Sequence, residues 1–189
     1  MAVEAGGRKF ESRHHDHDRA GQVLRRLAGC KATPKLAAML ITQGGYEIDD
    51  DPGRLDVDAI HAFLARDAYW SAGIPLDVLS RAIAGSLNFG LYRDGAQVGF
   101  ARVVSDKATF AWLADVYVLP DHRGRRLGHW LVQAALDHPD LQGLRRIVLA
   151  TSDAHRIYAD CGFVPLADPQ RWMAITTSAE ELYRAAAGE

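Results

Sequence analysis

The order of secondary structure in this chain is decided by residues 109–136, which read TFAWLADVYVLPDHRGRRLGHWLVQAAL. Residues 109–118 form a long β-type run, and Pro120 ends it because proline cannot continue a sheet ladder. Over residues 127–136 the apolar side chains recur at helical spacing. A buried strand is expected next, over residues 147–150. A strand, a helix and a strand in this order favour a right-handed crossover that places the two strands parallel.

Upstream of this crossover the pattern predicts two helices and then an antiparallel meander. One helix follows Asp56 as its N-cap, and another follows Pro75. Strands are expected over residues 89–92 and 97–104. They are joined across the Asp-Gly pair at 94–95, which tolerates the positive φ angles of a tight hairpin turn.

Downstream of the crossover we expect a short helix, a last strand and a C-terminal helix. The short helix covers residues 153–160 and ends before Gly162, a residue suited to a helix C-terminus. Residues 170–176 form the last strand. Ser178 then caps a helix, and Glu181 completes a capping box.

The first part of the chain differs in composition from the rest. We expect residues 1–45 to be a weakly ordered N-terminal extension, with only short helices up to Ile41, and residues 46–189 to form the single domain. The His- and Asp-rich run at 14–18 contains metal-ligand types without a rigid frame, so no metal site is expected there. Whether residues 1–38 belong to the native protein stays open.

Composition excludes several classes of protein. The chain has 189 residues, 48% of them hydrophobic and 24% charged, which fits one domain with a buried core. Its formal net charge of -2 disfavours a nucleic-acid binder. Two cysteines, Cys30 and Cys161, indicate a reducing cytoplasm rather than a disulfide scaffold. No run approaches the roughly 18 to 20 apolar residues of a membrane span, and the N-terminus lacks the apolar segment of a signal peptide.

The turn between the long strand and its helix, residues 121–129, is rich in glycine and arginine. Backbone N–H groups and the helix dipole converge at such a point and favour an anion such as a phosphate. Gly124 and Gly128 allow close approach to the backbone. Three arginines can add charge-assisted contacts, namely Arg123, Arg125 and Arg126. The alternative is an ordinary surface turn with solvated arginines.

Together with its flanking segments, this turn resembles the GCN5-related N-acetyltransferase (GNAT) family. The family's acyl-CoA site has the pattern Gln/Arg-x-x-Gly-x-Gly/Ala. Residues 123–128 read Arg-Gly-Arg-Arg-Leu-Gly, with Arg126 in place of the middle glycine. Residues 115–120 and 157–163 resemble the family's neighbouring segments in the same order. The resemblance extends over roughly residues 46–176. It implies an α+β fold with a mostly antiparallel central sheet, a parallel strand-helix-strand crossover and splayed central strands.

For the cofactor, the resemblance implies acetyl-CoA as co-substrate and no metal. Backbone groups of Val116, Tyr117 and Val118 would pair with the pantetheine arm and the thioester carbonyl, because a splayed strand lacks sheet partners there. The segment from Thr151 to Ala154 would border the pantetheine. The pyrophosphate would lie against Arg123, Gly124, Arg125, Arg126, Leu127, Gly128 and His129.

For catalysis, Tyr158 occupies the family's usual position for the general acid. A phenol with a pKa near 10 stays protonated at neutral pH and can donate to the leaving thiolate. The alternative is that Tyr158 only packs. Asp115 is the candidate base, but strand alternation places it on the face opposite Trp112 and Ala114. A structural hydrogen-bonding role for Asp115 is therefore the competing interpretation.

Tyr69 and Trp70 lie in the linker between the first two predicted helices, where relatives of this family commonly place acceptor-binding side chains. They either line the acceptor pocket or close the core. Cys161 has no activating base marked in the sequence, so a packing role is favoured over a nucleophile.

The expected function is an acetyl-CoA-dependent N-acetyltransferase that transfers the acetyl group directly to a primary amine. A rival hypothesis is a catalytically silent acyl-CoA sensor or interaction module, because Arg126 departs from the motif and the matching strand positions carry no carboxylate. The expected partner is a small-molecule or peptide amine, rather than a nucleic acid or a membrane. The identity of that amine and the choice between monomer and homodimer stay open.

Overall fold

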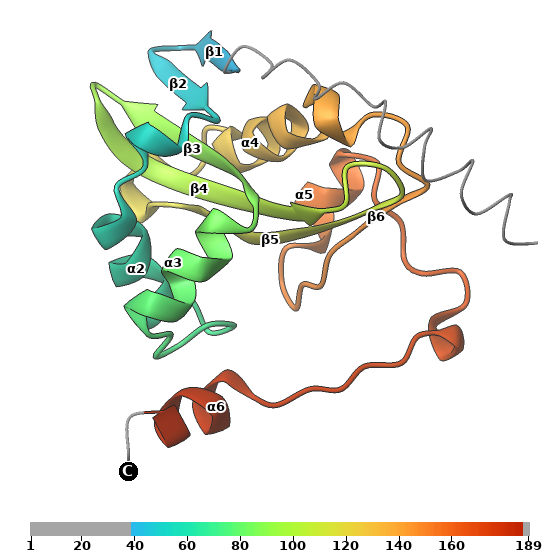
Figure 1. The fold of residues 1–189 in the computed structure, drawn as a ribbon. Helices are drawn as coiled ribbons and strands as arrows, with labels where there is room; N and C mark the ends of the chain where they lie inside the picture. Colours follow the sequence, from blue (N-terminus) through green and yellow to red (C-terminus); the bar gives the residue numbers. More distant parts are fainter. Residues whose placement is uncertain (1–38, 187–189) are drawn as a thin grey trace, which may run out of the picture. The chain divides into compact units, whose positions relative to one another are not determined.

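The structure, a computed structural model, describes residues 39–186, which lie in the unit that begins at Ala38. In chain order its elements are β1 (Leu40–Gln43), β2 (Tyr46–Asp49), η1 (Pro52–Arg54), α2 (Val57–Arg66), α3 (Leu76–Ala84), β3 (Leu87–Arg93), β4 (Ala96–Ser105), β5 (Phe110–Val118), η2 (Pro120–His122), α4 (Leu127–Leu136), η3 (Pro139–Leu141), β6 (Arg146–Val148), α5 (His155–Asp160), η4 (Pro169–Arg171) and α6 (Ala179–Ala186) (Figure 1). No helix within residues 39–186 has the length and apolar content needed to cross a bilayer.

One mixed sheet contains all six of these strands, in the spatial order β1-β2-β3-β4-β5-β6. Neighbouring strands are antiparallel except β5 and β6, which are parallel and are connected through α4. The predicted crossover, meander and α+β class are confirmed. The hairpin between β3 and β4 turns at Asp94 and Gly95, whose φ angles of 50° and 82° are those that the Asp-Gly pair predicted.

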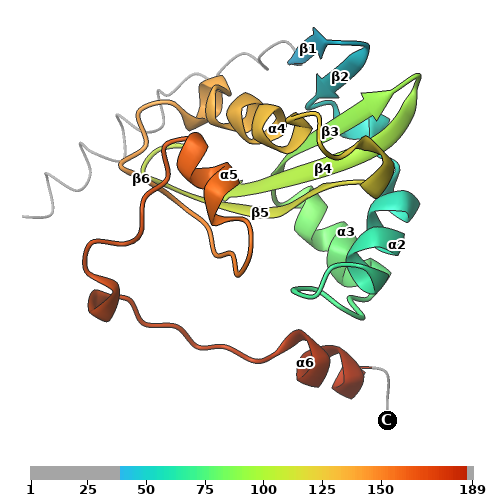
Figure 2. The ribbon, with the colours of Figure 1, turned by 180° about the vertical axis from the view of Figure 1, so that it is seen from behind.

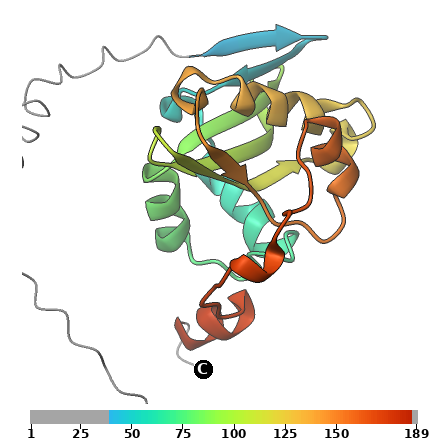
Figure 3. The same cartoon turned by 90° about the vertical axis from the view of Figure 1, so that its right-hand side faces the viewer.

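Two apolar clusters fix the helices to the two faces of the sheet (Figures 2 and 3). On one face, α4 packs Leu131 and Val132 against strand residues such as Phe89, and all three are fully buried. On the other face, α2 and α3 cover Phe100 and Tyr117. The middle of β4 and the end of β5 are therefore packed against helices, and this packing fixes the strands relative to the helices.

The sheet begins earlier than the sequence pattern indicated. β1 pairs with β2 across Gly44 and Gly45, whose φ angles are 58° and 80°. The expectation of short helices up to Ile41 is therefore wrong for its last residues, which form β1. Glycine supplies these turn angles at low cost. The run at 14–18 and Cys30 lie outside the described residues.

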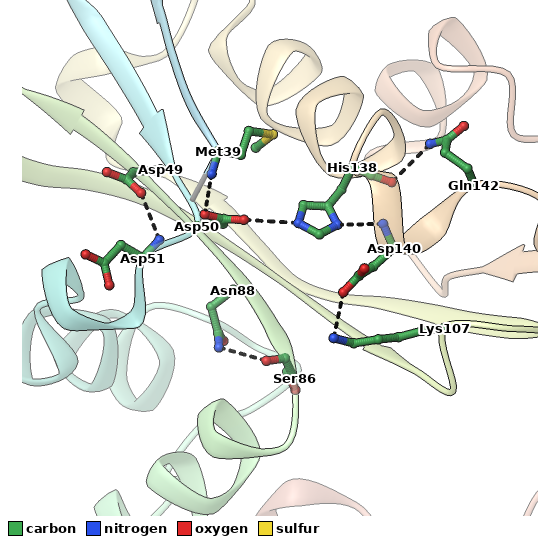
Figure 4. A network of polar contacts seen from close by, with 10 residues as sticks. All are labelled: Met39, Asp49, Asp50, Asp51, Ser86, Asn88, Lys107, His138, Asp140 and Gln142. Atoms are coloured by element: carbon green, nitrogen blue, oxygen red, sulfur yellow. Dashed lines mark hydrogen bonds and ion pairs between the residues drawn. The ribbon is translucent and has the colours of Figure 1, made fainter. Parts of the chain in front are cut away.

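A chain of polar contacts fastens this hairpin to the connection between α4 and β6 (Figure 4). The Asp50 carboxylate accepts from the Met39 backbone N–H at 2.6 Å and lies 3.0 Å from Nε2 of His138. Nδ1 of His138 accepts from the backbone N–H of Asp140 at 3.1 Å, so the ring proton faces Asp50. Asp140 in turn pairs with Lys107 at 2.6 Å.

Beyond α5 only part of the predicted pattern is formed. α6 begins with the predicted capping box, in which the Ser178 hydroxyl accepts from the Glu181 N–H and the Glu181 carboxylate accepts from the Ser178 N–H. The last strand predicted over residues 170–176 is absent from the described part of the chain. A short 3-10 turn and an extended stretch take its place.

Candidate functional site

The two parallel strands separate after a short paired stretch. β5 pairs with β6 only over Phe110–Trp112, opposite Arg146–Val148. From Leu113 to Val118, β5 pairs with β4 on one side, except at Asp115 and Val116, and has no strand partner among the described residues on the other side. This is the splay that the resemblance implied. It exposes a row of backbone N–H and C=O groups that a ligand can use in place of a strand.

A β-bulge lies in the separated part of β5. The register between β4 and β5 shifts between Phe100 and Arg102, and Asp115 on the opposite strand has a positive φ of 52°. The strands approach closely here, because a Cβ at Gly99 would lie 2.8 Å from the Tyr117 carbonyl oxygen. Bulges of this kind redirect side chains next to the position where they occur.

The bulge overturns the predicted orientation of Asp115. Ala114 pairs with Arg102 across the sheet, so their side chains share one face. The Asp115 carboxylate contacts Arg102 Nε at 2.7 Å and therefore lies on that face, not on the opposite one. Its other oxygen accepts from Trp70 Nε1 at 3.2 Å. Both oxygens are engaged, which favours the structural interpretation of Asp115 over the base.

The turn before α4 has the backbone conformation of an anion site. Gly124 has a φ of 77°, and Arg126, at the N-cap, has a φ of 60° in the left-handed region. No side chain caps this helix. The N–H groups of residues 127–129 have no hydrogen-bond partner among the described residues. A Cβ placed on Gly124 or Gly128 would meet no atom within 4 Å. Space and donors for a diphosphate are therefore both present.

All three arginines of this turn are exposed, but two of them form hydrogen bonds with backbone carbonyls. Arg123 Nε donates to the Val118 carbonyl at 2.8 Å, and Arg125 donates to the Asp121 carbonyl at 2.7 Å. These two side chains therefore shape the loop and tie it to the end of β5. The side chain of Arg126 is exposed and forms no hydrogen bond within the described part of the chain.

Tyr158 lies on α5, partly buried against the cluster beneath α4, and meets Phe163 edge-on with ring centroids 6.0 Å apart. Its hydroxyl has no hydrogen-bond partner among residues 39–186, so it is available to a ligand. Burial, reinforced by Tyr69 and Asp153, raises the pKa of Tyr158 to about 12. The phenol therefore stays protonated at physiological pH.

Cys161, at the end of α5, behaves as a packing residue. Its thiol contacts the His129 carbonyl at 3.8 Å, and burial raises its pKa. A raised pKa disfavours the thiolate that a nucleophile requires. Over the described range, no three His, Cys, Asp or Glu side chains are grouped as metal ligands.

The linker between α2 and α3 bridges the two separated arms of the sheet. Trp70 bonds to Asp115 on β5, and the Tyr69 hydroxyl bonds to Ser152 beyond β6. The two rings meet edge-on at 5.1 Å and remain 58% (Tyr69) and 40% (Trp70) exposed. They do not close the core. Thr151 accepts from the Ala154 N–H at 3.0 Å and so shapes the turn into α5.

The sequence analysis did not identify Arg102 or the contact of Ser152 with Tyr69. Neither belongs to a local motif, because each acts through a contact with a residue far along the chain: Ser152 with Tyr69, and Arg102 with Asp115. Only the bulge and the linker bring these groups together. Tyr69 and Trp70 are thus connected to the segment after β6, through Ser152, and to β5, through Asp115.

The sequence matches the Acetyltransferase (GNAT) family over residues 57–163. It is 38% identical over 139 residues to a candidate acetyltransferase of Gibberella zeae, which covers 62% of this chain and 77% of that protein. A candidate GNAT acetyltransferase from Xanthomonas campestris pv. campestris is 49% identical. Its crystal structure matches with a TM-score of 0.71 over 75% of this chain and 99% of that one.

The fold also recurs in more distant proteins. A candidate acetyltransferase from Clostridium acetobutylicum, whose crystal structure contains acetyl-CoA, is 14% identical. It matches with a TM-score of 0.52 and covers 73% of this chain and 96% of that one. Fold, sequence pattern and relatives agree, and the chain therefore belongs to the GNAT acetyltransferase family.

Proposed function

We propose that this protein is an acetyl-CoA-dependent N-acetyltransferase that transfers the acetyl group directly to a primary amine of a small molecule or peptide. One observation carries the proposal: the uncapped start of α4 follows, after η2 and one turn, the strand whose ladder is open. The first feature suits a diphosphate and the second suits an amide-containing arm. Coenzyme A contains both groups. The cytoplasm, expected from the cysteine usage, fits such a co-substrate.

The residues that would hold acetyl-CoA follow from this geometry. Backbone groups of Val116 and Tyr117 would pair with the pantetheine arm, while the Val118 carbonyl already accepts from Arg123. The segment from Thr151 would border the arm on the β6 side. The diphosphate would accept from the N–H groups of Leu127, Gly128 and His129. That the Clostridium acetobutylicum protein of the same fold contains acetyl-CoA supports this assignment.

Bound acetyl-CoA would supply an activated acetyl group, and the chain's own residues handle the protons. As the amine nitrogen forms a bond to the thioester carbon and the C–S bond breaks, the Tyr158 hydroxyl donates a proton to the departing sulfur. Its pKa of about 12 keeps that proton in place before transfer. The attacking amine releases its proton to water, and water returns a proton to the Tyr158 phenolate, so the hydroxyl is restored. Asp115 is not assigned as the base, because both of its oxygens are engaged.

Asp115 is assigned a positioning role. Its carboxylate holds the Trp70 indole at the mouth of the splay and is itself fixed by Arg102. Tyr69 and Trp70 would then present an aromatic wall to the acceptor, since their rings are exposed and anchored at opposite arms of the site. An amine that carries an apolar or aromatic group would pack well against such a wall.

The experiment measures binding and turnover separately. Calorimetry with acetyl-CoA and with free CoA tests the cofactor site, and release of CoA thiol in the presence of a panel of amines tests transfer. If neither coenzyme form binds the folded protein, the proposal fails. If acetyl-CoA binds but no amine in a broad panel yields thiol, the silent acyl-CoA sensor is the better description. The engagement of both Asp115 oxygens favours that second candidate.

Replacing Tyr158 by phenylalanine tests the acid. Tyr158→Phe should lower turnover by about 100-fold and leave acetyl-CoA affinity nearly unchanged, because only the proton donor is removed. With a pKa of about 12, Tyr158 should not cause a loss of rate between about pH 6 and 9. Tyr183→Phe, outside the proposed site, is the control. An undiminished rate in Tyr158→Phe would remove Tyr158 from the mechanism.

A further inference from the structure

Aromatic side chains lie around the point at which β5 and β6 separate. Trp112 on β5 stands in the last paired position of the two parallel strands. Beyond it on β5, the Asp115 carboxylate accepts from Trp70 Nε1. Beyond β6, Ser152 bonds to the Tyr69 hydroxyl. These five residues are called the acceptor portal below, because an amine that reaches a thioester in the splay would pass between them.

The Trp112 side chain lies on the same face of the sheet as the Asp115 carboxylate. Trp112 and Ala114 are two positions apart on β5 and therefore share a face. Ala114 pairs with Arg102 on β4, and Arg102 Nε lies 2.7 Å from the Asp115 carboxylate. The Trp112 indole therefore faces the side of the sheet on which Trp70 is held.

An exposed apolar strip begins at Trp112 and continues away from the splay. Val104 on β4 pairs with Trp112, and Phe110 lies two positions before Trp112 on the same face. Each of these three side chains is between 37% and 42% exposed. Large apolar side chains that are exposed next to one another mark a binding surface more often than single ones do. The strip is continuous with the aromatic wall of Tyr69 and Trp70, which is assigned to the acceptor.

The C-terminal stretch of the chain does not pack against Trp112. Met173 is 97% exposed and Ile175 is fully exposed, so neither covers the indole. Figures 1 and 2 both show the stretch between η4 and α6 running apart from every strand. The start of the strip is therefore open to a ligand in the part of the chain that the structure describes.

Asp153 provides a negative charge beside the portal. It lies in the turn between β6 and α5, is exposed, and forms no hydrogen bond or ion pair with any other residue in the range 39–186. Burial raises the pKa of Tyr158, and Tyr69 and Asp153 raise it further, so the Asp153 carboxylate lies near the proposed proton donor. The Asp115 carboxylate, by contrast, is already paired with Arg102. A cationic amine is therefore attracted to Asp153.

We propose that the acceptor is a primary amine with a single positive charge and a flat aromatic group, which binds with its ammonium beside Asp153 and its ring against Trp112. This inference rests on the proposed function and names its acceptor class. The ring packs on the apolar strip, and Tyr69 and Trp70 contact the carbon chain that joins it to the amine. A polyamine would place its further charges on the apolar strip and lose their hydration. An amino acid would bring its own carboxylate next to Asp153.

The first test compares 2-phenylethylamine, hexylamine, spermidine and free phenylalanine as acceptors. CoA thiol release at saturating acetyl-CoA gives kcat/KM, and calorimetry with and without CoA gives the affinity of each amine. The value for 2-phenylethylamine should exceed that for hexylamine about fivefold, because an aromatic pair adds to the burial of apolar area. Spermidine and phenylalanine should fall below hexylamine. Calorimetry should give the same order.

The second test changes Trp112. Trp112→Ala should raise the KM for 2-phenylethylamine about tenfold and leave acetyl-CoA affinity and turnover of methylamine unchanged, because methylamine has no ring to reach the strip. Trp112→Phe should restore most of the preference. Trp172→Ala is the matched control: Trp172 is also 39% exposed, but it lies after η4 against Arg146, at the end of the strip away from the portal. It should leave the preference unchanged.

The third test removes the charge. Asp153→Asn should raise the KM for 2-phenylethylamine about threefold, the effect expected of one exposed ion pair, and Asp160→Asn on α5 should not. Equal kcat/KM and equal affinity for the four amines would overturn this inference and leave the proposed function standing, as would a preference lost in Trp172→Ala but kept in Trp112→Ala. If acetyl-CoA binds but no amine is acetylated, the proposed transfer fails, and the calorimetric order of the amines still decides the inference. Binding of none of them would overturn it.

Discussion

Helices α2 and α4 begin in opposite ways. At α2, the Asp56 carboxylate accepts from the Ala59 N–H at 2.9 Å, as in most helices whose first N–H groups need a partner. At α4, the N-cap is Arg126 in a left-handed conformation, and no side chain caps the helix. At the start of α2 a side chain of the protein satisfies a backbone N–H group. At the start of α4 the first N–H groups have no such acceptor and are available to a ligand.

The largest effect should come from placing a carboxylate at the open end. Gly128→Glu should weaken CoA binding about 100-fold, because the carboxylate competes with the diphosphate for the same N–H groups and repels it. The melting temperature should not fall, since an acidic residue in the first turn of a helix is favourable. Calorimetry and thermal unfolding measure the two effects.

Gly128→Ala is the matched control for that experiment. A Cβ at this position meets no atom within 4 Å, so alanine should fold well and change affinity far less than glutamate. Equal losses of affinity in the two variants would contradict an anion site at this helix start. The loss of CoA affinity would then be caused by the volume of the side chain at position 128 and not by its charge.

Removing the carboxylate that caps α2 should change stability and leave CoA binding unchanged. Asp56→Ala should lower the free energy of unfolding by about 1 kcal/mol, because the Ala59 N–H loses its acceptor. CoA affinity should not change, because Asp56 belongs to no proposed contact. Urea denaturation combined with calorimetry would check both values. A marked loss of CoA binding in Asp56→Ala would break the distinction between the two helices.

The smallest effect concerns Arg126 itself. Arg126→Gly relieves about 1 kcal/mol of left-handed strain but gains chain entropy in the unfolded state, so a net stabilisation of about 0.5 kcal/mol is expected. If the diphosphate is held by backbone donors, CoA affinity should change by less than about threefold. A large, salt-dependent loss of affinity would instead show that the Arg126 guanidinium binds the diphosphate.

Much of the fold could be predicted from local pattern. The helical spacing after residue 127, the Asp-Gly hairpin and the Ser178 capping box each depend on residues a few positions apart, and all are formed. The last strand failed because a strand needs a partner edge, and no β-type pattern specifies one. β1 was missed for the converse reason: its four residues gain their structure from pairing with β2.

The residues of the candidate site also differ in whether a local pattern or a contact between distant residues defines them. The sequence led to the proposal of the turn at residues 121–129 through its consecutive glycines and arginines. It led to the proposal of Tyr158 through the resemblance of residues 157–163 to the family. The orientation of Asp115 could not, because a bulge at that residue interrupts the alternation on which the prediction rested. Nor could the contacts of Tyr69 and Trp70, which join segments widely separated in the chain.

By itself, the sequence determined the crossover, the glycine- and arginine-rich turn and the order of the helices, because periodicity and turn chemistry act between near neighbours. Only the tertiary structure decided where β5 leaves β6, which face carries the Asp115 carboxylate and which segment stays without a strand. These features depend on register and on contacts between distant residues, and no local pattern encodes either of them.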